Sequence, residues 1–150
     1  EVKDCRVNLH LPPPSTVDFE TFEAYYHRKE WAAALAYCGG EFLPEYRYAG
    51  WSVSRRQWLA QDIQHAELEM AKIWLAENQW FKALEASRKV LAIEPWQDQA
   101  VLLGMRACFG MGDRSGALRL YKTFEKTLRD ELGIEPPEEL QELARTFRKL

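Results

Sequence analysis

The chain has 150 residues, of which 47% are hydrophobic and 13% are aromatic, and its formal net charge is −3. This length and apolar content indicate one folded domain with a core and exclude a disordered chain. Nucleic-acid-binding domains usually carry a basic face or excess, so the interspersed charges predict no direct nucleic acid contact by this segment. No apolar run approaches the roughly 20 residues of a membrane span. No secretory signal is visible, and we therefore expect a cytoplasmic protein without membrane contact.

The first 16 residues differ in pattern from everything after them. Val7, Leu9 and Leu11 alternate with polar residues, which is typical of a short strand or extended segment. Three consecutive prolines at 12–14 follow and predict a stiff linker. We interpret residues 1–16 as a linker or as the tail of an upstream domain that this chain lacks. Residues 17–150 form the predicted main domain.

From residue 18 onward the apolar residues recur only at helical spacing, which predicts an all-α domain. We expect about seven helices, at residues 18–27, 30–38, 51–77, 80–93, 97–111, 114–131 and 137–149. A glycine- and proline-containing connection at 38–51 separates the second from the third.

The predicted helices form pairs, and the pairs repeat. Two features recur, a polar turn between the helices and an alanine in the second helix: the turns are at 29–30, 78–79 and 112–113, and the alanines at 34, 83 and 117. The second and third copies are 34 residues apart, which is the period of a tetratricopeptide repeat. The predicted architecture is therefore a right-handed stack of antiparallel helix pairs. A small residue where two helices cross lets their backbones approach closely.

The end of the sixth predicted helix carries strong stop signals. Gly133 follows the last apolar-periodic residue, where a left-handed cap conformation is most favourable without a Cβ atom. Pro136 and Pro137 lack the N–H group that a continuing helix needs. Proline and the following glutamates suit the first turn of a new helix. The segment predicts a helix, a corner and a final capping helix.

The sequence contains no pattern typical of catalysis, metal binding or cofactor binding. Its three histidines do not have metal-ligand spacing, and there is no Cys-x-x-Cys pair and no glycine-rich phosphate loop ending in Lys-Ser/Thr. We therefore predict a protein that is not an enzyme and has no catalytic, metal or cofactor site. Cys5, Cys38 and Cys108 are interpreted as reduced thiols, the last two in the core.

A surface that binds a partner is the expected site. By repeat register, seven residues fall on the first helices of the pairs, which line the concave face of such stacks: Tyr26, His27, His65, Lys72, Gln99, Arg106 and Phe109. An aromatic and basic inner face suits an acidic peptide or a partner helix. The alternative, which we favour, is that Tyr26 and Phe109 belong to the core and that Lys72 and Arg106 are simply solvated.

A second candidate surface comprises Trp51, Arg55 and Arg56. Tryptophan and arginine are the residue types most enriched at interface hot spots. The neighbouring Trp58 and Leu59 also fit the buried face of the helix, and for these two we favour the core.

Three segments together resemble a known family. They are GGEFLPEY at 39–46, WSVSRRQWL at 51–59, and GDRSGALRLYKTFEKTLRDELGIEPPEEL at 112–140. The combination resembles the bacterial transcriptional activator domain of regulators of the antibiotic regulatory protein (SARP) class, over about residues 17–150. The matching positions are Trp51, Arg56, Tyr121, Leu132, Gly133, Glu135, Pro136 and Leu140. Compared with common members, the first helical pair is shortened.

The resemblance implies a non-catalytic regulatory domain beside a winged-helix domain that binds DNA. Such a domain is expected to act through self-association as a possible homodimer, through contact with its own DNA-binding domain, or through another protein partner. Two alternatives remain open: a generic peptide-binding adaptor of the tetratricopeptide type, and a small-molecule-sensing domain that uses Tyr26, His27 and Phe109.

Overall fold

The computed structural model describes residues 18–38 and 50–149, except for the side chains of residues 51 and 52. Within these ranges the chain forms helices and no strand, which confirms the all-α class. The helices are α1 Asp18–His27, α2 Trp31–Ala36, α3 Gly50–Ala76, α4 Trp80–Ile93, α5 Asp98–Gly110, α6 Arg114–Thr127 and α7 Glu138–Lys149, with a π-helical turn, η2 Leu128–Leu132, continuing α6. The extended segment predicted within residues 1–16 lies outside the described residues.

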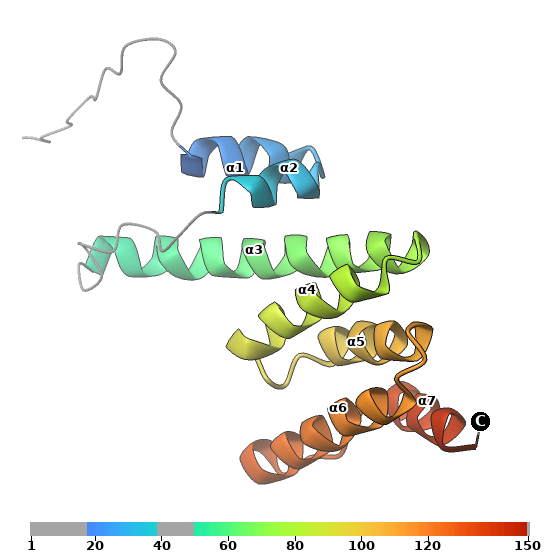
Figure 1. Ribbon diagram of the computed structural model, residues 1–150. Helices are drawn as coiled ribbons and strands as arrows, with labels where there is room; N and C mark the ends of the chain where they lie inside the picture. Colours follow the sequence, from blue (N-terminus) through green and yellow to red (C-terminus); the bar gives the residue numbers. More distant parts are fainter. Residues whose placement is uncertain (1–17, 39–49, 150) are drawn as a thin grey trace, which may run out of the picture.

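The helices stack in chain order as the pairs α1/α2, α3/α4 and α5/α6, with α7 at the end of the stack (Figure 1). The first helices of successive pairs run parallel, as their contacts show. From α1 to α3, Glu23 meets Arg55 and Tyr26 meets His65. From α5 to α7, Arg106 meets Glu139 and Phe109 meets Phe147. The helices α1, α3, α5 and α7 thus form one side of the stack, which we call the first-helix face.

The three turns within the pairs have the same backbone geometry. In each, one residue is left-handed: Lys29 with φ 61°, Asn78 with φ 59° and Gly112 with φ 79°. The next residue donates its N–H to the carbonyl oxygen five positions earlier, over 3.0, 2.7 and 2.9 Å respectively. Since the turns recur at the predicted positions, the sequence repeat corresponds to a structural repeat.

The recurring alanine is completely buried in the second helix of every pair. Ala34, Ala83 and Ala117 are each 0% exposed. The core continues from one pair to the next because Trp74, Leu75 and Leu91 pack against both of its clusters. One cluster joins α3, α4 and α5, and the other joins α4, α5, α6 and α7.

The corner before α7 confirms the expected cap. Gly133 is left-handed with φ 67°, and its N–H donates to the Arg129 carbonyl oxygen over 3.2 Å. Pro136 is buried, and its carbonyl oxygen accepts from the Gln141 side-chain amide at 2.8 Å. Leu140 is 2% exposed within the core, whereas Glu135 is exposed and faces Arg129 at 3.6 Å.

Three expectations need correction. Trp58 is not a core residue, because 66% of it is exposed, while Leu59 is half-buried. The second helix is shorter than the expected 30–38 and spans only Trp31–Ala36. The last turn of the sixth helix is π-helical, which the apolar spacing did not indicate.

Substituting leucine for Ala83 should destabilise the fold, because the added atoms have no room at the crossing. We expect Ala83→Leu to lower the free energy of unfolding by about 1–3 kcal/mol. Ala92 is exposed on the same helix, so Ala92→Leu should change it by less than about 0.5 kcal/mol. Urea denaturation of both variants tests this, and equal costs would contradict the close crossing.

Gly133→Val should lower the free energy of unfolding by about 1–2 kcal/mol, the cost of a left-handed residue with a Cβ atom. A Cβ at this position would meet no atom within 4 Å, so the cost comes from the backbone conformation alone. Gly133→Asn should cost less, because asparagine tolerates this conformation. Thermal and urea unfolding of the two variants provide the measurement, and an asparagine variant as unstable as the valine variant would argue against this cause.

Candidate functional site

The long helix α3 carries most of the candidate site. It has 27 residues against 14 in its partner α4. Six of its residues are spaced alternately three and four apart, which places them on one side of the helix. We call this set the α3 stripe: Arg55, Trp58, Asp62, His65, Glu69 and Lys72.

The α3 stripe combines residues from both surfaces predicted from the sequence. His65 and Lys72 belong to the predicted concave face, and Arg55 belongs to the predicted second surface. Trp51 has the same register one turn earlier, but its side chain lies outside the described residues. Arg56 is one position out of register and is half-buried.

An aromatic cluster joins α1 and α2 to the middle of the stripe. Tyr26 and His65 share a hydrogen bond of 2.9 Å between the phenol oxygen and Nδ1. The Trp31 ring lies edge-on to both, with centroids 5.4 Å from each. His27 lies edge-on to Tyr26 at 6.0 Å. Three of the predicted residues therefore come together, with Trp31 as a fourth member that the sequence reading did not include.

Charged pairs surround the cluster. The Arg55 guanidinium contacts the Glu23 carboxylate at 2.8 Å and lies over the Phe19 ring, 4.1 Å from its centroid. Further along the stripe, Lys72 donates to the Glu69 carboxylate at 2.6 Å, and His65 Nε2 lies 3.8 Å from the same oxygen. Exposed pairs of this kind contribute little to stability, and they place charges of both signs along the stripe.

The acidity of Tyr26 is perturbed by its surroundings. Burial raises the pKa of its phenol from 10.0 to about 12, and the Asp62 and Glu69 carboxylates add to the effect. The neutral phenol therefore persists well above the pH at which an exposed tyrosine ionises.

Trp58 is the most exposed large apolar side chain of the stripe. It is 66% exposed, and Ile73, next to the end of the stripe, is 41% exposed. The sequence signal that could have identified Trp58 is the alternation of three and four residues with Arg55 and His65. That signal was ambiguous because the same spacing also describes a core face.

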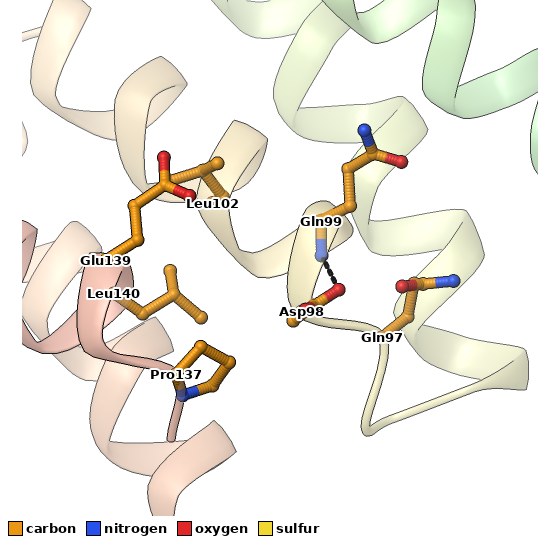
Figure 2. Close-up of a pocket in the computed structure, with 7 residues that line it drawn as sticks. All are labelled: Gln97, Asp98, Gln99, Leu102, Pro137, Glu139 and Leu140. Carbon is orange, nitrogen blue, oxygen red and sulfur yellow. Dashed lines mark hydrogen bonds between the residues drawn. The ribbon is translucent and has the colours of Figure 1, made fainter.

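The predicted residues on α5 have a different environment, because α7 lies against them. Arg106 pairs with Glu139 at 3.3 Å, and the Phe109 ring stacks on Phe147 with centroids 4.2 Å apart and planes 3° from parallel. Gln99 lines an open cleft of about 300 Å³ between the first turns of α5 and α7, with Gln97, Asp98, Leu102, Pro137, Glu139 and Leu140 (Figure 2). The structure thus divides the predicted face into an open α1/α3 part and a part beside the capping helix.

The described residues offer no group of three or more His, Cys, Asp and Glu side chains that could hold a metal ion. Among these residues, no helix is long and apolar enough to cross a membrane. Cys38 and Cys108 are free thiols, and burial raises the pKa of both, to about 11 for Cys38. Cys5 lies outside the described residues.

A stack of helix pairs with an exposed aromatic and charged face is the architecture of helical-repeat proteins, whose extended surfaces bind other molecules. The family comparison identifies the class further. The bacterial transcriptional activator domain matches residues 17–148, and the chain belongs to this family. The resemblance inferred from the three sequence segments is thereby confirmed. No curated protein and no solved structure matches the chain.

The raised pKa of Tyr26 predicts how stability depends on pH. The folded state favours the neutral phenol, so this contribution is complete below pH 10 and is lost as the pH rises from 10 toward about 12. The decrease in the free energy of unfolding over this interval should be smaller in Tyr26→Phe than in the parent chain. Urea titrations at several pH values measure it, and parallel decreases in both proteins would contradict the assignment.

Proposed function

We propose that this chain is the non-catalytic regulatory domain of a bacterial transcriptional activator, in which a separate domain binds DNA. It would act in the cytoplasm by binding protein. The family match over residues 17–148 is the observation that carries the proposal. The open α1/α3 part of the first-helix face is the surface we assign to the partner.

The side chains of this surface support a protein partner. Trp58 supplies a large apolar anchor of the kind that dominates interface energetics. The charged members of the stripe are two cations, Arg55 and Lys72, and two anions, Asp62 and Glu69, which balance. A partner with interspersed charges and an apolar pocket fits this pattern better than a uniformly acidic ligand such as nucleic acid.

The preferred partners are the chain's own DNA-binding domain and a second copy of this domain. The α1/α3 part of the face lies at the N-terminal end of the stack, where the proposed linker of residues 1–16 joins it. A domain tethered there would have a high effective concentration at Trp58 and Tyr26. Phe109 stacks on α7, far in the stack from Tyr26 and His27, so a small-molecule site built from these three residues receives less support.

Sedimentation equilibrium tests the proposal, first on this chain alone and then on its mixture with the DNA-binding part of the same regulator. We expect association in one of the two experiments. Trp58→Ala should weaken it at least about 30-fold, as is typical of a hot-spot residue. Trp96→Ala is the matched control, because Trp96 is 47% exposed but lies in the connection between α4 and α5.

The outcomes separate the mechanisms. Self-association would mean that the domain pairs two DNA-binding domains on adjacent half-sites. A monomer that binds the DNA-binding part would be an intramolecular control element. Absence of both associations, or equal weakening by the two tryptophan substitutions, would contradict the assigned surface.

A further inference from the structure

A second feature of the fold is a partly open cavity of about 390 Å³ lined by α2, the residue Cys38 after it, α3 and α4. Its lining is mostly apolar, with one thiol and one ion pair: Ala32, Leu35 and Cys38 from α2 and its end, Ile63, Glu67, Met70 and Trp74 from α3, and Lys89 from α4. This volume is within the range of small-molecule sites.

The cavity lies where the second helix of the first pair is short. α2 has 6 residues, whereas α4 and α6, the second helices of the other pairs, have 14 each. The four lining residues of α3 are spaced four, three and four apart and form one continuous face. A helix as short as α2 spans only about 9 Å of that face.

Glu67 is the polar group of the cavity. It is only 7% exposed, and one carboxylate oxygen, Oε1, accepts from Lys89 Nζ at 2.7 Å. The other oxygen, Oε2, is buried and has no hydrogen-bond partner among the described residues. Buried acceptors are nearly always paired with a protein group, a ligand or an ordered water, so an unpaired carboxylate oxygen in a cavity is a position where a donor can bind.

We propose that this cavity binds a small neutral aromatic molecule that carries one O–H or N–H donor. The donor would bond to Glu67 Oε2, and the ring would pack among Leu35, Ile63 and Met70, whose thioether sulfur favours contact with aromatic rings. Glu67 and Lys89 already neutralise each other, so a neutral ligand leaves no unbalanced charge. An anion would face the buried carboxylate.

This site is separate from the partner surface. Glu67 follows His65 by two positions and is rotated by about 200° around α3. A ligand here would hold α2, α3 and α4 together from the side opposite the α3 stripe. The ligand proposal therefore does not depend on the proposed function, and each can fail without the other.

Isothermal titration calorimetry with matched ligands tests the proposal on the whole chain. Indole and 2-naphthol carry the donor, whereas N-methylindole and 2-methoxynaphthalene have nearly the same shape without it. We expect the two donors to bind at least about tenfold more tightly than their methylated counterparts, because the methylated ligands would leave Oε2 unpaired.

Two comparisons test whether indole binds in this cavity: Ala32→Phe against Ala36→Phe, and Glu67→Met against the parent chain. Ala32 is exposed and lines the cavity, and Ala36 is exposed on the same helix but does not line it. Ala32→Phe should weaken indole binding at least about tenfold by filling the entrance, and Ala36→Phe should leave it unchanged. Glu67→Met should still bind indole and N-methylindole but should no longer prefer indole. This measurement remains informative even if the Ala32→Phe protein does not fold.

Three results would overturn the proposal. The first is no detectable binding of indole or 2-naphthol up to their solubility limits. The second is equal affinity for donor and methylated ligands in the parent chain. The third is unchanged indole binding by a folded Ala32→Phe protein, with folding established by circular dichroism.

Discussion

The close crossing of two helices beside a left-handed turn is the constraint on which the rest of this structure depends. Each turn reverses the chain direction within a few residues. The alanine that follows it, on the second helix, is small enough to let the two helices of the pair pack closely. Ala34, Ala83 and Ala117 have no exposed surface. Because the same unit occurs three times, the pairs stack with their first helices parallel.

Among the described residues, the stack has a capping helix, α7, at one end and none at the other. At the C-terminal end, α7 places Leu140 and Phe147 in the core and stacks Phe147 on Phe109. At the N-terminal end, α3 extends well beyond the length of α4 and bears the exposed Trp58. This asymmetry gives the domain a half that α7 stabilises and a half in which Trp58 of α3 is exposed.

Departures from the repeat mark the two candidate sites. The short α2 leaves a cavity with a buried, half-paired carboxylate, and the long α3 leaves an aromatic and charged stripe. Neither feature improves the stability of the fold by itself, since a buried unpaired oxygen and an exposed tryptophan are both unfavourable. Local departures from an otherwise consistent pattern are expected at functional sites.

The sequence by itself determined the all-α class, the paired repeat, the positions of the turns and the left-handed Gly133, because these follow from local periodicity and backbone sterics. It also determined the family through short motifs. Only the tertiary structure decided that Tyr26, Trp31 and His65 meet, that Phe109 and Arg106 lie beside α7, and that Trp58 is exposed while Glu67 is buried. The physical reason is that helical spacing identifies which residues share a side of a helix, whereas the neighbours packed against that side are set by contacts between segments distant in the chain.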